Sequence, residues 1–219
     1  MSYELKYPYV AIDGPIGVGK TTLSKLIAKR VGADTLLEDV ANPFLPDFYA
    51  GKKGAAFQCQ LFFLLTRYQQ QQKLVQRNLF TRHVVADFMP QKDRIFAYLN
   101  LTDSELVLYE KLYSVLLESL PQPDAVIYLQ ASTPTLIERM KSRKRYYEKN
   151  TAEEYVEELN KAYNYYFFHN QKGPLLIVNT NDINFEMEAS ELDHLIEQVN
   201  RLEKNVMFYA PPGSTAVDR

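Results

Sequence analysis

The residues with the clearest chemistry lie between Gly14 and Thr21, where the spacing G-x-x-x-x-G-K-[ST] of a phosphate-binding loop is complete. In such a loop the glycines let the backbone bend, so that its N–H groups surround phosphate oxygens. Lys20 is expected to reach the β- and γ-phosphates, and the Thr21 hydroxyl to bind Mg²⁺. We therefore predict a site for ATP with Mg²⁺. Its expected contacts are Gly14, Pro15, Ile16, Gly17, Val18, Gly19, Lys20, Thr21 and Thr22.

A second group of charged residues runs from Arg139 to Arg145, with five cations in seven residues. The i,i+4 spacing of Arg139 and Arg143 puts both guanidinium groups on one face of a helix. Beside a phosphate-binding loop, such a cluster is suited to close over the triphosphate and stabilise charge on a transferring phosphoryl group. We expect Arg139 and Arg143 to act in catalysis, and Arg143 and Arg145 to contact ATP. The alternative is a solvated basic face at a helix C-terminus.

Three carboxylates follow apolar runs that are expected to form strands. Glu38 comes directly after the run 34–37, where a carboxylate can take the proton from an attacking hydroxyl. Asp39 competes for this role. Asp87 ends the run 83–86, where enzymes with this loop commonly keep an acidic residue on or near Mg²⁺. Structural caps and exposed loop carboxylates are the alternative interpretations.

Short apolar runs alternate with longer segments of helical periodicity along the chain. This alternation predicts a three-layer α/β/α P-loop NTPase fold around a five-stranded parallel sheet, with ligands at the carboxyl edge of the sheet. The expected strands are Tyr9–Ile12, Asp34–Leu37, His83–Ala86, Ala125–Leu129 and Leu175–Val178. The expected helices are Thr21–Val31, 55–79, Thr102–Leu120, a segment beginning at Thr133, and Thr151–Asn170.

Composition sets the size of the fold and the class of its partners. The chain has 219 residues, of which 46% are hydrophobic, which predicts one domain over 1–205 and a disordered tail over 206–219. The net charge of −2 gives no bulk attraction to nucleic acid or anionic membranes, so small molecules are the expected partners. We expect a cytoplasmic protein, because no apolar run approaches a membrane span and no signal-peptide pattern is present. Cys59 lies inside a helical pattern and is expected to be a small packed residue.

Two of the expected helical segments carry more apolar surface than one face of a sheet needs. These segments are 55–79, whose first half is unusually apolar, and 106–117. We therefore expect a homodimer formed by helix-to-helix contact.

Taken together, the motifs resemble the deoxyribonucleoside kinases, the family that includes deoxycytidine, deoxyguanosine and bacterial deoxyadenosine kinases. The resemblance covers residues 8–180 and rests on several motifs in the right order. These are the phosphate-binding loop, Glu38, Gln60-x₆-Arg67, Asp87-x₅-Asp93-Arg94-x-Phe96, and the arginines at 139, 143 and 145 followed by Glu148.

The resemblance implies ATP-dependent phosphorylation of a deoxynucleoside 5′-hydroxyl for nucleotide salvage, with deoxyadenosine as the preferred acceptor and deoxycytidine or deoxyguanosine second. It implies that Glu38 is the general base and that Phe96 stacks on the nucleobase. It further implies that the Gln60 carboxamide reads the base edge, beside a charged pair of Arg67 and Asp93, and that Tyr49 and Glu148 hold the 3′-hydroxyl. From the residues alone, Gln60, Phe96 and Tyr49 fit ordinary packing equally well.

One position departs from the family pattern. The family usually places an arginine after the acidic residue at this strand end, whereas this chain has Phe88 after Asp87. Loss of that cation predicts a raised pKa for Glu38, unless Arg82 or Arg94 compensates.

Two other functions compete with the family assignment. A thymidylate-kinase-like nucleoside monophosphate kinase shares the fold and the loop, but it needs a cation for the acceptor phosphate, and Phe88 argues against it. A nucleotide-binding regulatory module without turnover is the other alternative. The segment Asn179–Asp182 resembles a guanine-reading motif but lacks its lysine.

Overall fold

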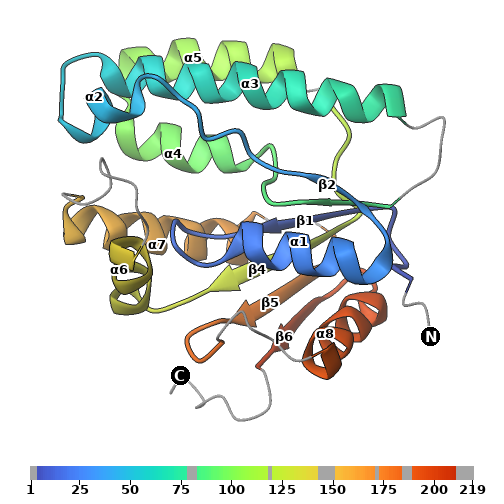
Figure 1. Ribbon diagram of the computed structural model, residues 1–219. Helices are drawn as coiled ribbons and strands as arrows, with labels where there is room; N and C mark the ends of the chain where they lie inside the picture. The colour runs from blue at the N-terminus through green and yellow to red at the C-terminus, as the bar shows by residue number, and fades with distance from the viewer. Residues whose placement is uncertain are drawn as a thin grey trace.

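A parallel sheet forms the centre of the molecule in the computed structural model, which describes residues 4–77, 83–117, 120–142, 151–170, 173–183 and 189–210. Within these residues the sheet has six strands, in the order β2-β3-β1-β4-β5-β6 (Figure 1). The strands are β1 Tyr9–Asp13, β2 Asp34–Leu36, β3 Val84–Ala86, β4 Ala125–Gln130, β5 Leu175–Asn179 and β6 Val206–Tyr209. Every pair of neighbouring strands is parallel, so all carboxyl ends lie at one edge of the sheet.

Helices connect the strands, and local sequence signals explain several of their ends. The Glu105 carboxylate accepts hydrogen bonds from the Thr102 N–H and hydroxyl at the start of α5, and Gly32 ends α1 with a φ of 70°. The described helices are α1 Lys20–Val31, α2 Leu45–Tyr49, α3 Ala55–Arg77, α4 Lys92–Asn100, α5 Asp103–Leu117, α6 Thr133–Ser142, α7 Glu153–His169 and α8 Ala189–Arg201.

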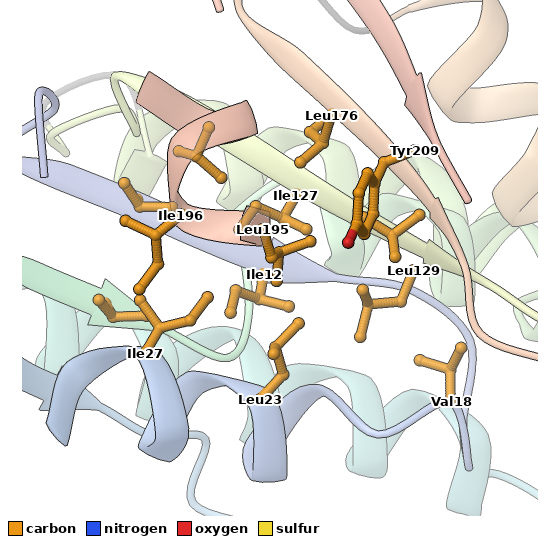
Figure 2. Close-up of a cluster of buried hydrophobic side chains, with 14 of the residues drawn as sticks. Ile12, Val18, Leu23, Ile27, Ile127, Leu129, Leu176, Leu195, Ile196 and Tyr209 are labelled. Carbon is orange, nitrogen blue, oxygen red and sulfur yellow. The ribbon is translucent and has the colours of Figure 1, made fainter. Parts of the chain in front are cut away.

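The two faces of the sheet bury separate hydrophobic clusters. On one face, side chains of α1 and α8 such as Ile27 and Ile196 pack against Ile12 and Ile127 of the central strands (Figure 2). On the other face, Tyr128 stacks on Phe167 of α7, with ring centroids 4.0 Å apart, and α4 and α3 contribute further side chains. The chain therefore has the predicted three layers.

The helices α3, α4 and α5 lie together at the top of Figure 1, beyond the β2 edge of the sheet. A third apolar cluster, which includes Leu64, Ala97 and Tyr109, joins one helix to the next. The opposite side of α5 exposes large apolar side chains: Val107, Leu108, Leu112 and Val115, which we call the α5 patch. No helix in the described part of the chain is long and apolar enough to cross a membrane.

The structure confirms the predicted fold class and corrects one strand assignment. The five expected strands are present, with ends that differ from the prediction by one residue at most. The predicted tail over 206–219 begins too early, because Val206–Tyr209 pairs with β5 as a sixth strand; residues 211–219 lie outside the described part. This strand is difficult to identify from sequence because it is a four-residue edge strand whose Val206 and Phe208 are exposed. Cys59 is buried, as expected.

The phosphate-binding loop is pressed against β4 and α6, and this contact requires glycine. A Cβ atom on Gly14 would lie 2.5 Å from the Leu129 carbonyl oxygen, and one on Gly17 would lie 2.9 Å from the Leu136 carbonyl oxygen. Gly17 also has a φ of 87°, which side chains disfavour. Backbone packing therefore fixes the shape of the loop.

We expect Gly17→Ala to lower the free energy of unfolding by about 2 kcal/mol more than Gly51→Ala, because the added methyl group meets backbone atoms. Gly51 is the matched control: its φ of 68° is also positive, but a Cβ there would meet nothing within 4 Å. Denaturant unfolding of both variants measures the difference. Equal losses would show that backbone conformation, and not the contact with α6, accounts for the effect.

Candidate active site

The parallel sheet brings three acidic residues to its carboxyl edge. Asp13 ends β1, Glu38 follows β2, and Asp87 follows β3. Asp13 is fully buried; its Oδ1 accepts the Gly14 N–H at 2.7 Å, and its Oδ2 accepts the Met89 N–H at 3.1 Å. Asp13 thus ties the start of the phosphate-binding loop to the segment after β3.

The phosphate-binding loop presents its lysine and threonine at this edge. The Lys20 ammonium donates to the carbonyl oxygens of Gly14 at 2.7 Å and Pro15 at 3.0 Å. The Thr21 hydroxyl donates to Asp87 Oδ2 at 2.5 Å. Gly19 precedes α1 without a side-chain cap, so the N-terminus of α1 faces the loop with its backbone donors. The Val18 side chain is buried in the core (Figure 2), and it therefore anchors the loop.

Glu38 is held by two cations from neighbouring helices. Lys92 of α4 donates from Nζ to Oε1 at 2.9 Å and to Oε2 at 2.7 Å. Arg67 of α3 donates from Nε to Oε1 at 3.0 Å, and its Nη2 also contacts Oε1. The Glu38 N–H donates to Asp87 Oδ1 at 2.6 Å, which fixes the backbone. Burial alone would raise the pKa of Glu38, but the charges of Arg67 and Lys92 outweigh it and hold the pKa well below its usual value.

Arg67 also pairs with a second carboxylate, that of Asp93. Its Nη1 forms an ion pair with Asp93 Oδ1, so one guanidinium joins two carboxylates. Asp93, Arg67, Glu38 and Lys92 form a cluster of two anions and two cations, which we call the buried charge cluster. Arg67 is 4% exposed and Asp93 is 1% exposed, so these charges are neutralised by one another more than by water.

A cavity of about 110 Å³ is lined by these groups and by three aromatic side chains, Tyr49, Phe63 and Phe96, which we call the aromatic wall. One end is formed by the phosphate-binding loop and the acidic strand ends, and the other by side chains of α2, α3 and α4. The lining residues are Ile16, Lys20, Thr21, Glu38, Val40, Leu45, Tyr49, Gln60, Phe63, Arg67, Asp87, Lys92 and Phe96. Phosphate-binding groups, a carboxylate and a flat apolar surface thus meet within one cavity.

The structure brings most of the predicted site residues together. Lys20, Thr21, Glu38, Tyr49, Gln60, Arg67, Asp87 and Phe96 line the same cavity, and Asp93 joins them through its ion pair with Arg67. Arg139 lies elsewhere: its guanidinium donates to the Thr180 hydroxyl at 3.1 Å and to the carbonyl oxygens of Thr180 and Ile183, in the loop after β5. Its role in catalysis remains a prediction. Arg143, Arg145 and Glu148 lie outside the described residues.

The two competing carboxylates after β2 point to different environments. Glu38 lines the cavity, whereas Asp39 is exposed and its Oδ1 accepts the N–H of Ala41 at 2.9 Å. The geometry therefore favours Glu38 over Asp39 as the residue that contacts a reacting hydroxyl.

Sequence reasoning missed Lys92 and therefore predicted the wrong direction for the pKa of Glu38. The pKa is lowered, because the charges of Arg67 and then Lys92 outweigh the effect of burial, although Phe88, which is fully buried, supplies no cation. Arg94, one proposed substitute, pairs instead with Glu110 through two hydrogen bonds, and Arg82 lies outside the described residues. The available signal was position: Lys92 lies one helical turn before Phe96 and therefore on the same helix face.

Thr21 and Asp87 are the groups suited to Mg²⁺. Their direct hydrogen bond shows that both oxygens reach one point beside the loop. The described residues contain no group of three His, Cys, Asp or Glu side chains that could hold a metal ion. A hydroxyl and one carboxylate nevertheless fit Mg²⁺ delivered with a triphosphate, because that ion keeps water and phosphate oxygens as its other ligands.

Comparison with known proteins identifies the family of the chain. Residues 10–204 match the deoxynucleoside kinase family. The chain is 34% identical to the deoxyguanosine kinase of Bacillus subtilis, over 89% of this chain and 97% of that protein. It is 37% identical to the deoxyadenosine kinase of Dictyostelium discoideum, over 73% of this chain and 66% of that protein.

Among solved structures, the deoxyadenosine kinase from M. mycoides with dCMP and dCDP bound aligns with a TM-score of 0.69 and 29% identity. The alignment covers 86% of this chain and 96% of that one, and the same enzyme with bound dATP gives a TM-score of 0.68. Sequence and fold agree: the chain belongs to the deoxynucleoside kinase family, and it is a phosphotransferase.

Proposed function

We propose that this deoxynucleoside kinase transfers the γ-phosphoryl group of ATP to the 5′-hydroxyl of deoxyadenosine, in nucleotide salvage. The observation that carries the proposal is the single cavity in which Lys20 and Thr21 of the phosphate-binding loop face Glu38, with Gln60 and Phe96 beyond it. This order of groups matches an ATP phosphate, a sugar hydroxyl and a nucleobase. The structural relative from M. mycoides binds dATP and also dCMP and dCDP, which supports a deoxynucleotide at the site.

The reaction joins the 5′-oxygen to the γ-phosphorus and breaks the bond from that phosphorus to the β,γ-bridging oxygen. Lys20 stabilises charge on the phosphates, and the Glu38 carboxylate accepts the hydroxyl proton as the new bond forms. Thr21 and Asp87 would hold Mg²⁺, which neutralises charge on the β- and γ-phosphates. The products are a nucleoside monophosphate and ADP, and the proton on Glu38 returns to solvent.

Neither competing function fits as well. A monophosphate acceptor would need a cation for its own phosphate at the end of β3, where this chain has the buried Phe88. The segment proposed for guanine reading shapes a loop: Asn179 Oδ1 accepts the N–H of Asn181, whose own Oδ1 accepts the N–H of Ser132. The relatives named above are kinases, which supports turnover over passive nucleotide binding.

The nucleobase preference rests on the polar groups beyond Glu38. The Gln60 carboxamide can donate to a ring nitrogen and accept from an adjacent exocyclic amine, an edge that adenine and cytosine present. Asp93, which forms an ion pair with Arg67, would add a second acceptor for an amino group. Relatives include both deoxyguanosine and deoxyadenosine kinases, and the proposed preference for deoxyadenosine over deoxyguanosine rests on the family resemblance more than on the chemistry of the base edge.

Competition among acceptors tests the proposed function. We expect kcat/KM to be highest for deoxyadenosine, lower for deoxycytidine and deoxyguanosine, and poor for thymidine, whose edge presents O4 and N3–H. All nucleoside monophosphates should be poor acceptors. The Lys20→Ala variant gives the background rate of phosphate transfer, since loss of the ammonium removes stabilisation of the transferring group. Thymidine or a monophosphate as the best acceptor would contradict the proposal.

The role of Glu38 is tested by paired substitutions of adjacent carboxylates. Glu38→Gln keeps the shape but cannot accept a proton, so kcat should fall by roughly 10²-fold or more, with ATP binding little changed. Asp39→Asn is the control, because Asp39 is exposed and bonds the backbone. Steady-state kinetics and a binding titration with a non-hydrolysable ATP analogue give both quantities. A larger loss in Asp39→Asn would show that the wrong carboxylate has been assigned.

We further propose that the α5 patch is the contact surface of a homodimer. Four apolar side chains of one helix face are exposed there, and Val115 is 77% exposed. A cluster of exposed apolar side chains on a soluble domain marks an interaction surface more often than a solvated face. Two copies of α5 related by a twofold axis would cover the patch symmetrically.

Val115→Asp should therefore shift the molar mass in light scattering from that of a dimer to that of a monomer, because a charge in an apolar contact is not compensated. Phe208→Asp is the control, since Phe208 is 69% exposed on β6, away from α5. A monomeric wild-type protein, or equal effects of the two substitutions, would contradict the proposed interface.

A further inference from the structure

Lys92 is a buried lysine whose ammonium lies against the Glu38 carboxylate. It is 4% exposed, and in the described part of the chain its ammonium hydrogen-bonds Glu38, with one bond to each carboxylate oxygen. An ammonium has three N–H donors, so one remains for a further acceptor. A lysine that served packing alone would keep its ammonium in water, because burial of a charge is costly.

The position of the ammonium shows where that third donor can act. Lys92 lines the cavity together with Lys20 and Thr21, which belong to the phosphate-binding loop. Its Nζ also lies 5.8 Å from the ring centroid of Phe96, on the nucleobase side. The ammonium therefore lies between the groups for phosphate and the groups for the nucleoside, beside the carboxylate that faces the reacting hydroxyl.

Electrostatics indicate the same central position. Burial raises the pKa of Asp13, and the charge of Lys92 opposes that shift more strongly than the charge of Lys20 does. Lys92 is thus close to the end of β1 as well as to Glu38. Helix α4 supplies this cation, because the residue that follows Asp87 after β3 is Phe88 and carries no charge.

We propose that Lys92 is a catalytic residue that bridges Glu38 and the transferring phosphoryl group. This inference rests on the proposed role of Glu38. In the reaction, the 5′-oxygen bonds to the γ-phosphorus as the bridging P–O bond breaks, and the electron pair of that bond leaves with ADP. Lys92 holds the Glu38 carboxylate toward the hydroxyl with two N–H groups. It donates the third to an equatorial phosphoryl oxygen, where negative charge is spread in the transition state.

Four variants test the inference. Lys92→Met removes the charge and keeps much of the length, and kcat should fall by about 10²-fold while the KM for deoxyadenosine changes by less than about threefold. Lys92→Arg restores a cation and should recover kcat to within about tenfold of wild type. Arg94→Met is the control on the same helix; Arg94 pairs with Glu110, so kcat should be unchanged. The Kd of a non-hydrolysable ATP analogue should be similar in all single variants.

The fourth variant combines Lys92→Met with Glu38→Gln, which removes one charge of each sign and keeps the buried cluster balanced if the single variant does not fold. Because Lys92 also contacts the phosphoryl group, kcat of the double variant should be lower than that of Glu38→Gln alone. A folded Lys92→Met protein with wild-type kcat, or a double variant equal to Glu38→Gln, would overturn the inference. Full turnover of Glu38→Gln would instead overturn the proposed role of Glu38, independently of the value for Lys92→Met.

Discussion

The site depends on the mutual neutralisation of four charges that water hardly reaches. Asp93, Arg67, Glu38 and Lys92 come from α3, α4 and the segment after β2, and each charge is stabilised by its opposite neighbour. Removal of one member of a buried pair commonly costs about 3–5 kcal/mol, because the other charge stays buried without a partner. The helices α3 and α4 must therefore lie against the end of β2, and this constraint positions the part of the aromatic wall that they carry.

The same neutralisation determines how Glu38 can act. A carboxylate whose pKa is held low by two cations is a weak base, so in the proposed reaction Glu38 would accept the proton late, when the bond from the 5′-oxygen to phosphorus is well advanced. Its first proposed contribution is to orient the hydroxyl.

The parts of this site that could be predicted from sequence are those set by local pattern. The loop from Gly14 to Thr21 has a fixed spacing, and buried strands such as β1 are continuous apolar runs. Glu38 follows from its place at a strand end. Lys92 was missed because α4 was not predicted as a helix, so the spacing that places Lys92 and Phe96 on one helix face was not used; its burial is a tertiary property that the local sequence does not show. The short edge strand β6 was missed for a similar reason: its pairing with β5 is a tertiary contact.

The difference between Phe88 and Lys92 shows how a fold can supply the same charge from another element. A fully buried Phe88 fills apolar volume at the strand end, where an arginine would need an acceptor for each of its N–H groups. The chain continues from this strand into α4, and Lys92, at the first position of that helix, has a long flexible stem that reaches back to Glu38. An ammonium is a compact charge, so it can contact both carboxylate oxygens and still keep one donor. Relocation of the cation therefore preserves neutralisation of Glu38 while the strand end becomes part of the core.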